Sequence, residues 1–147
     1  NNTLTGKILT FDEINDKIWD VECNIFIPGA ASKIISKNQI ERLIDKGCEL
    51  VSCGANVPFE DDGVFFGETA KEIDGKISLI PDFVANCGMA RVFAYLMKED
   101  IEVTDESIFF DVSDTIGTFL KDLYIENKSP LLISHYSLIK SLQKLKP

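Results

Sequence analysis

The sequence is poor in basic residues and has no long apolar run. Its 147 residues include 15 Lys and Arg against 24 Asp and Glu, which gives a formal net charge of −9. Proteins that bind nucleic acid normally carry a basic patch, and none is found here. No apolar stretch approaches the roughly 18–20 residues of a membrane-spanning helix. We therefore expect neither a nucleic-acid partner nor a membrane partner.

Residues for metal and thiol chemistry are also few. The four cysteines, at positions 23, 48, 53 and 87, form no C-x-x-C pair, and His135 is the only histidine. A zinc site is therefore not expected, and no metal ligand is assigned. Cys23 and Cys53 lie in apolar runs, which predicts buried, reduced thiols and a cytoplasmic protein. A disulfide in a secreted protein is the alternative.

Familiar catalytic motifs are missing as well. The sequence has neither G-x-G-x-x-G nor G-x-x-x-x-G-K-[ST], the two common phosphate-binding loops. His135 stands alone among polar neighbours, and Asp61 and Asp62 fall in a predicted turn, where Asp has a local role. No catalytic residue is assigned. The chain begins with Asn1-Asn2 rather than Met and has no signal-peptide pattern, so we expect either that a segment has been removed or that this is a piece of a longer protein.

What is present indicates a folded α/β protein, with 45% hydrophobic residues and ten Phe. The capping boxes at Thr10–Glu13 and Ser36–Gln39 predict a helix over about 11–19 and another after Ser36 that ends at Gly47. Three apolar runs stopped by Pro or Gly predict strands buried on both faces. A short helix is also predicted, and it ends at Gly75. The predicted strands cover residues 24–27, 49–53 and 77–80, and the short helix covers 69–74.

The rest of the sequence has helical periodicity. Asp82 or Asn86 is the predicted N-cap of one helix, and Thr104 caps a second that runs to Leu123. Ser129-Pro130 is expected to begin the last helix, with Pro at the first helical position. The predicted inner face of that helix consists of Leu131, Ile139, Leu142 and Leu145.

Alternating helices and strands indicate a parallel sheet with right-handed crossovers. Three strands are half of the usual nucleotide-binding sheet. The expected fold class is thus α/β, a partial Rossmann-like fold (half of a doubly wound parallel sheet) with C-terminal helices. Ligands of such sheets bind beyond the carboxyl ends of the strands, here residues 28–31, 54–58 and 81–88. Their Gly, Ala, Pro and Asn residues suit a flat ligand, but they are also ordinary loop residues.

These segments read VECNIFIPGA over residues 21–30, GANVP over 54–58 and PDFVANCG over 81–88. In this order and spacing they resemble the Glu/Leu/Phe/Val amino-acid dehydrogenase family, whose motifs are a strand ending in IPAA, a GAN-x-P loop and a PD-x-x-ANxGG segment. The resemblance covers roughly residues 10–97. It implies that residues 1–100 are the second half of a dinucleotide-binding domain, and that 101–147 are a helical extension packing on it.

The resemblance implies that this half-domain lines the nicotinamide side of a cleft for NAD or NADP. Asn56 would bond the nicotinamide ribose or ring, and Gly88 and Phe93 take substrate-binding positions. The implied cofactor-binding residues are Pro28, Gly29, Ala30, Gly54, Ala55, Asn56 and Asn86. The family's phosphate loop and catalytic Lys and Asp would precede residue 1. The implied substrate is an amino acid, and the full-length protein is expected to be a homo-oligomer.

The sequence departs from the family pattern at several of these positions. Cys53 stands where the family usually has Glu, Met89 replaces a Gly, and Phe93 replaces a Ser that holds the substrate carboxylate. Arg91 either compensates for that Ser or is simply solvated. Two functions follow: part of an enzyme for oxidative deamination, inactive as an isolated piece, or a degenerate, non-catalytic module that binds a nucleotide or another subunit.

Overall fold

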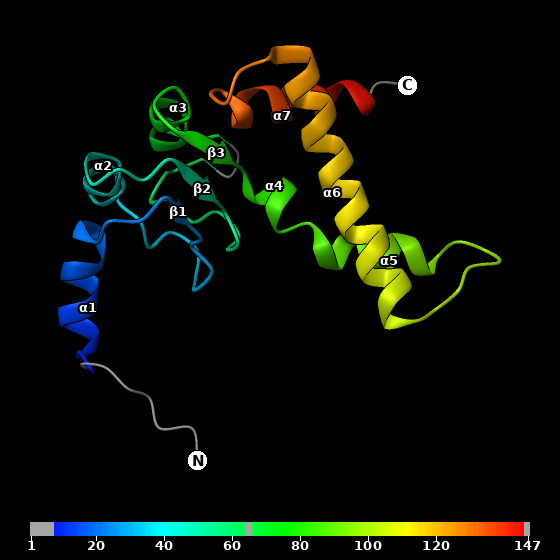
Figure 1. Cartoon of the computed structure of the whole chain (residues 1–147), viewed down its shortest axis with the longest axis horizontal. Coiled ribbons are helices and arrows are strands. Elements are labelled where there is room, and N and C mark those ends of the chain that lie inside the picture. The colour runs from blue at the N-terminus through cyan, green and yellow to red at the C-terminus, as the bar shows by residue number, and fades with distance from the viewer. Residues whose placement is uncertain (1–7, 64–65, 146–147) are drawn as a thin grey trace.

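The structure is a computed structural model that describes residues 8–63 and 66–145. A small parallel sheet with its covering helices forms one side of the molecule, and the long helix α6 forms the other (Figure 1). The elements, in chain order, are α1 (Phe11–Lys17), the 3₁₀ helix η1 (Ile18–Asp20), β1 (Ile25–Phe26), α2 (Lys37–Asp45), β2 (Leu50–Ser52), α3 (Glu68–Asp74), β3 (Ser78–Ile80), α4 (Asp82–Ala85), α5 (Gly88–Leu96), α6 (Asp105–Asn127) and α7 (Ile133–Lys144).

The sheet confirms the predicted parallel α/β fold. Its strand order is β1-β2-β3, and both neighbouring pairs are parallel. Leu50 of β2 pairs with Ile25 on one side and with Ser78 on the other. Because each strand returns to the sheet through α2 or α3, all three strands end at the same edge.

The predicted capping boxes are present and begin their helices where expected. The Thr10 hydroxyl accepts a hydrogen bond from the Glu13 amide at 3.3 Å, and the Glu13 carboxylate accepts one from the Thr10 amide at 3.0 Å. Ser36 and Gln39 repeat this exchange at the start of α2. Gly47 follows α2 with a φ of +92°, a conformation that favours glycine.

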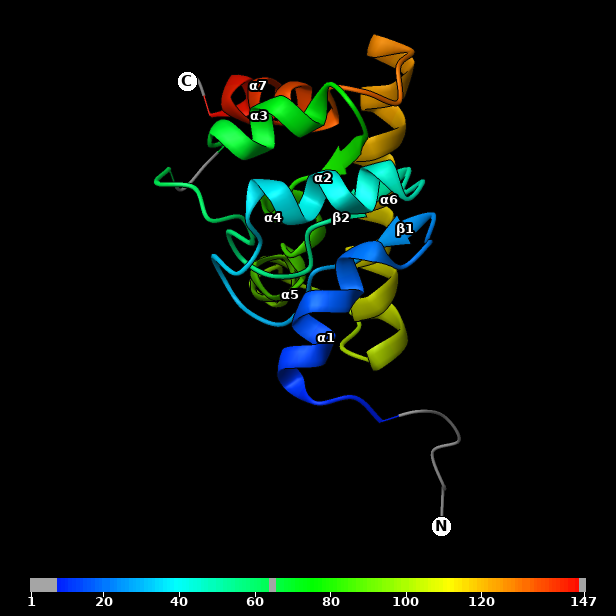
Figure 2. The same cartoon turned by 90° about the vertical axis from the view of Figure 1, so that its left-hand side faces the viewer.

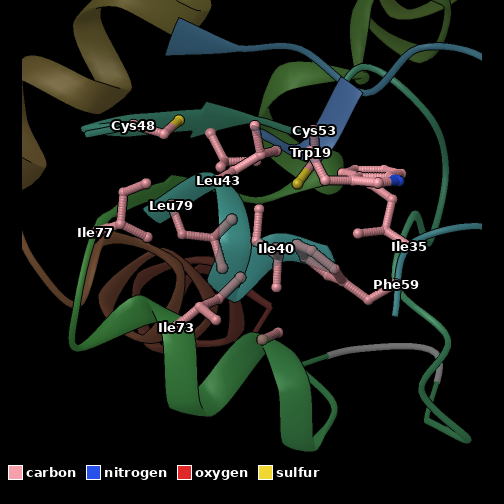
Figure 3. Close-up of a cluster of buried hydrophobic side chains, with 12 residues drawn as sticks. Trp19, Ile35, Ile40, Leu43, Cys48, Cys53, Phe59, Ile73, Ile77 and Leu79 are labelled. Carbon is pink, nitrogen blue, oxygen red and sulfur yellow. The ribbon is translucent and has the colours of Figure 1, made fainter. Parts of the chain in front are cut away.

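The core lies between the sheet and helices α2 and α3 (Figure 3). Val51 and Leu79, the central residues of β2 and β3, are buried, as the sequence predicted for these two strands. Ile40 of α2 and Ile73 of α3 reach the same cluster and are also completely buried. Each such side chain stabilises the fold by roughly 1.5–3 kcal/mol relative to an exposed position.

The prediction that the first strand is buried on both faces is wrong. The strand covers only Ile25 and Phe26, and the Ile25 and Ile27 side chains are 59% and 65% exposed. β1 is an edge strand: among residues 8–63 and 66–145 it pairs only with β2, on one side. The apolar residues that suggested burial instead form an open surface.

The segment after β3 forms two helices instead of the predicted one, and neither Asp82 nor Asn86 is an N-cap. Asp82 is the first residue of α4, and Asn86 follows the end of that helix. The Asp82 carboxylate accepts hydrogen bonds from the amides of Phe83 and Val57, at 2.9 and 2.8 Å. It therefore joins two loops, which a local helix signal does not reveal.

The helix predicted after Thr104 is confirmed as α6, but the predicted start and inner face of the last helix are wrong. Leu132 has a φ of +61°, and α7 begins only at Ile133, beyond Ser129-Pro130. The buried residues of α7 are Ser134 and Ser137, because this side of the helix packs near α3 (Figure 2). Of the residues predicted for the inner face, Ile139, Leu142 and Leu145 are exposed and Leu131 precedes the helix.

The start of α3 depends on a close contact at Gly67. The Asp61 carboxylate accepts hydrogen bonds from the Thr69 and Ala70 amides, at 3.0 and 3.4 Å. A Cβ at Gly67 would overlap the side chain of Asp61, so a side chain fits here only if Asp61 moves.

We expect Gly67→Ala to lower the free energy of unfolding by about 1–2 kcal/mol, because the new methyl group must displace Asp61 from the helix start. Gly75→Ala is the matched control, since a Cβ there meets no atom within 4 Å and the φ is −84°. Urea unfolding monitored by the fluorescence of Trp19 measures both variants. Equal stability of the two would show that the Asp61 contact does not hold α3.

Candidate functional site

Two hydrogen bonds tie together the three loops that follow the strands. The Ala55 amide, after β2, donates to the Pro28 carbonyl, after β1, at 2.6 Å. The Val57 amide donates to the Asp82 carboxylate, after β3, at 2.8 Å. The sheet therefore brings the three predicted loops to one edge, as expected from the parallel strand order.

Gly54 allows the first two loops to approach each other. A Cβ at this position would lie 3.3 Å from both the Ile27 side chain and the Pro28 carbonyl oxygen, and 3.7 Å from the Gly29 Cα. Contacts this short require the neighbouring backbone to shift. The glycine of the GAN motif thus has a steric role, because its missing side chain allows the loops after β1 and β2 to lie close together.

The predicted binding residues divide into buried and exposed ones. Pro28 and Ala55 are buried and Gly54 is half-buried, so these three residues build the loops. Asn56 and Asn86 are exposed, and their side-chain amides have no hydrogen-bond partner within residues 8–63 and 66–145. These two amides can therefore both donate to a ligand and accept from it.

Asp82 connects the two asparagine loops. Its side chain binds the Val57 amide next to Asn56, and its carbonyl accepts from the Asn86 amide at 2.7 Å. From the sequence, Asp82 is a possible helix cap and part of the loop over residues 81–88, with no predicted role in joining the loops. The available signal was its position directly after the Pro that ends β3, near the start of that loop.

Gly29 and Ala30 are exposed and lie beside α1. Together with Pro28 they line an apolar groove of about 250 Å³. Phe11, Ile14 and Ile18 form the facing wall of this groove. The groove and the two asparagine loops border the same ends of the strands.

Burial keeps the Cys53 thiol neutral. It raises the pKa of Cys53 to about 12, and the nearby negative charge of Asp82 acts in the same direction. Cys48 is also buried, Cys23 and Cys87 are half-buried, and all four cysteines are free thiols. At the position where the family usually has Glu, this chain therefore has an uncharged, buried group.

Gly88 and Phe93 lie on α5, which packs on α6 rather than on the sheet (Figure 1). The side chain of Phe93 is 61% exposed and that of Met89 is 68% exposed. The structure thus places these predicted substrate residues beyond α4, and it does not show them in contact with the loops that follow β1 and β2.

Arg91 is bound by a carboxylate of its own chain. Its Nε and Nη2 donate to the two oxygens of Asp111 on α6, at 2.5 and 2.7 Å. Arg91, and after it Lys98, hold the pKa of Asp111 below its usual range. Arg91 is therefore neither simply solvated nor free to replace the missing Ser.

Two further findings on the described residues concern membrane-spanning helices and metal-binding clusters. No helix among residues 8–63 and 66–145 combines the length and the apolar character needed to cross a bilayer. Over the same ranges, no three or more His, Cys, Asp or Glu side chains are arranged to hold a metal ion.

Comparison with known proteins shows which family and which enzymes this sequence resembles. Residues 4–123 match the sequence model of the family described as Glutamate/Leucine/Phenylalanine/Valine dehydrogenase. The leucine dehydrogenase of Thermoactinomyces intermedius is 39% identical over 74 residues, which cover 50% of this chain and 18% of that enzyme. The NADP-specific glutamate dehydrogenase of Psychrobacter sp. (strain TAD1) is 26% identical over 114 residues, covering 75% of this chain and 23% of the enzyme.

Solved structures share the fold. Glutamate dehydrogenase 2 of Plasmodium falciparum superimposes with a TM-score of 0.63 at 19% identity, over 85% of this chain and 28% of its own. A second glutamate dehydrogenase of Plasmodium falciparum gives a TM-score of 0.61 at 21% identity, over 86% and 27%. The chain thus spans less than a third of the length of each of these four relatives.

Proposed function

Because the chain belongs to the glutamate/leucine/phenylalanine/valine dehydrogenase family, we propose that it is the C-terminal nucleotide-binding portion of an NAD(P)-dependent amino-acid dehydrogenase. Residues 1–100 are then the second half of the dinucleotide-binding domain, and 101–147 are its helical extension. The observation that carries the proposal is the meeting of three family-like loops at one edge of a parallel sheet. Dinucleotides bind at this edge in open α/β sheets.

The residues at this edge fit a nicotinamide nucleotide. Gly29 and Ala30 leave the backbone after β1 open to a flat ring. The amides of Asn56 and Asn86, which have no partner in the described part of the chain, offer donors and acceptors for a ribose or a carboxamide. When bound, the cofactor would supply the capacity to accept a hydride from the α-carbon of an amino acid.

The chain itself would supply position and shape in this reaction. The Pro28–Ala55 and Val57–Asp82 hydrogen bonds fix the three loops relative to one another before a ligand arrives. Preorganised loops lose little conformational freedom on binding, and they hold donors at fixed points. The buried, neutral Cys53 adds no charge to this edge.

Substitutions at the two asparagines test the nucleotide site. In the complete gene product, Asn56→Ala and Asn86→Ala are each expected to weaken binding of NADH or NADPH by about fivefold, since each removes hydrogen bonding worth about 1 kcal/mol. Asn24→Ala is the control, because Asn24 is exposed and precedes β1, at the opposite ends of the strands from the loops. Enhancement of nicotinamide fluorescence measures affinity. Unchanged affinity in both loop variants would contradict the assignment.

A second function is favoured by the α5 residues. Phe93 presents an apolar ring, which has no donor for a substrate carboxylate, where the family has a Ser. Asp111 neutralises the charge of Arg91 and takes two of its N–H donors. This supports the alternative of a non-catalytic module that binds a nucleotide or another subunit. Assaying the complete gene product with both cofactors and a panel of Glu, Leu, Phe and Val decides between the functions. Turnover supports the enzyme, whereas binding without turnover supports the module.

The proposal extends to assembly and location. Exposed aromatic side chains on α5 and α6, Phe93, Phe109 and Phe110, support burial of this surface in a homo-oligomer of the complete protein. The four free thiols support a reducing, cytoplasmic location.

A further inference from the structure

The register of β1 and β2 places two cysteines opposite each other. Ile25 pairs with Leu50 and Phe26 with Val51, and the members of each pair are 25 residues apart. Cys23 and Cys48 have the same separation in sequence. The pairing continues toward them, because the Asn24 carbonyl accepts hydrogen bonds from the Glu49 and Leu50 amides at 2.9 and 3.0 Å.

This position suits a disulfide bond. Neighbouring strands lie about 4.7–4.9 Å apart, and the Cα atoms of disulfide-bonded cysteines are usually about 4.4–6.8 Å apart. Side chains at paired positions of parallel strands point to the same face of the sheet. Both cysteines accordingly belong to one hydrophobic cluster, with Cys48 buried and Cys23 packed on it from a half-buried position.

The other two cysteines lack such a partner. Cys53 follows β2 and is buried, while Cys87 lies between α4 and α5. The Cys48 thiol already points along the β1–β2 seam, because it contacts the carbonyl oxygens of Leu50 at 3.5 Å and Asn24 at 3.9 Å. Among the four cysteines, Cys23 and Cys48 are therefore the pair that the backbone places opposite each other for a disulfide bond.

We propose that Cys23 and Cys48 form a reversible disulfide when the protein meets a hydroperoxide. The more accessible Cys23 thiolate attacks the peroxide, which gives a sulfenic acid and leaves water or an alcohol after protonation. The Cys48 sulfur then attacks the sulfenic sulfur, and the departing hydroxide takes the Cys48 proton as water. The two thiols lose two electrons in total, and the hydroperoxide gains them. A dithiol reductant reverses the bond by exchange.

The disulfide would restrain the shortest strand of the sheet. β1 is a two-residue edge strand, and its end carries the Pro28 loop of the candidate site. The new bond would close the segment that contains α2 and fix β1 against β2 at the edge opposite the site. We expect oxidation to raise the melting temperature by roughly 5–10 °C, on the order usual for a disulfide in a domain of this size.

Peptide mapping tests the proposal directly. The protein is treated with hydrogen peroxide, its remaining thiols are blocked with N-ethylmaleimide, and it is digested with trypsin and the Glu-specific protease. Cleavage after Glu49 separates Cys48 from Cys53. The expected product is a cross-linked pair of peptides carrying Cys23 and Cys48, with the loss of two hydrogen atoms and recovery after dithiothreitol.

Matched variants complete the test. Cys23→Ser and Cys48→Ser should abolish both the cross-link and the rise in melting temperature, whereas Cys87→Ser, at another half-buried thiol, should leave both unchanged. A cross-link that forms mainly through Cys53 or Cys87, or a Cys23 that stops at sulfenic or sulfinic acid in the unsubstituted protein, would overturn the proposal.

Discussion

Replacing Asp74 with Ala is expected to lower the free energy of unfolding by about 3 kcal/mol and to detach the start of α7 from α3. The Asp74 side chain is completely buried, and its two oxygens accept hydrogen bonds from the Ser134 and His135 amides at 2.9 and 2.8 Å. Without the carboxylate, these two amides lose their partners at a buried helix start. Urea unfolding followed by Trp19 fluorescence and far-UV circular dichroism measures the loss.

Asp45→Ala is the matched control for this prediction. Asp45 is the last residue of α2, and its side chain is exposed. A surface substitution of this kind normally changes stability by less than about 0.5 kcal/mol. If both variants lose the same stability, Asp74 does not anchor α7.

The pH dependence of the same group has a definite sign. Burial raises the pKa of Asp74, although the Ser134 and His135 amides oppose this by stabilising the charged form. A folded pKa above the unfolded one means that the stability contributed by Asp74 is full below the ordinary Asp value and is lost as the pH rises through the folded pKa. The free energy of unfolding of the natural protein, compared with that of Asp74→Asn, should therefore decrease as the pH rises from the ordinary Asp pKa through the folded pKa of Asp74. An increase of this difference with pH would show that the amides outweigh burial.

The features predicted correctly from the sequence are those whose cause lies within a few residues. The Thr10–Glu13 box, the Ser36–Gln39 box and the glycine after α2 each depend on bonds or φ angles inside one turn of helix. Val51 and Leu79 were also predictable, because a short apolar run stopped by Pro or Gly carries its own signal.

The features that the sequence did not predict depend on distant partners. The start of α7 is set by Asp74, which is 60 residues from Ser134 in the chain, and this contact turns two serines inward where periodicity favoured leucines. The exposure of β1 follows from its place at the sheet edge, which no local pattern records. In both places tertiary context overrides the local sequence signal.

The same division applies to the candidate site. The three loops were predicted because each follows a strand and carries a family-like motif. The link through Asp82 and the Arg91–Asp111 pair were not, since each joins residues about 20 or more positions apart. The roles of Asn56 and Asn86 stay predictions that ligand binding must test.

The substitution Gly54→Val should affect both the fold and the proposed nucleotide site. Even a Cβ at this position would lie 3.3 Å from the Pro28 carbonyl oxygen, and valine adds two methyl groups beyond it. The loops after β1 and β2 must then separate, and the Ala55–Pro28 hydrogen bond breaks. We expect a loss of about 2–3 kcal/mol in the free energy of unfolding, in the range usual for overpacking.

Nucleotide affinity should decrease together with stability, because the separated loops no longer hold their donors in place. In the complete gene product we expect binding of NADH or NADPH to weaken by at least about tenfold, measured at a temperature where the variant stays folded. Gly75→Ala is the control outside the loops: Gly75 follows α3, and a Cβ there meets nothing within 4 Å. If Gly54→Val loses stability but binds the nucleotide normally, the loop contact serves the fold alone. If Gly75→Ala weakens binding as strongly, close approach at Gly54 is not what shapes the site.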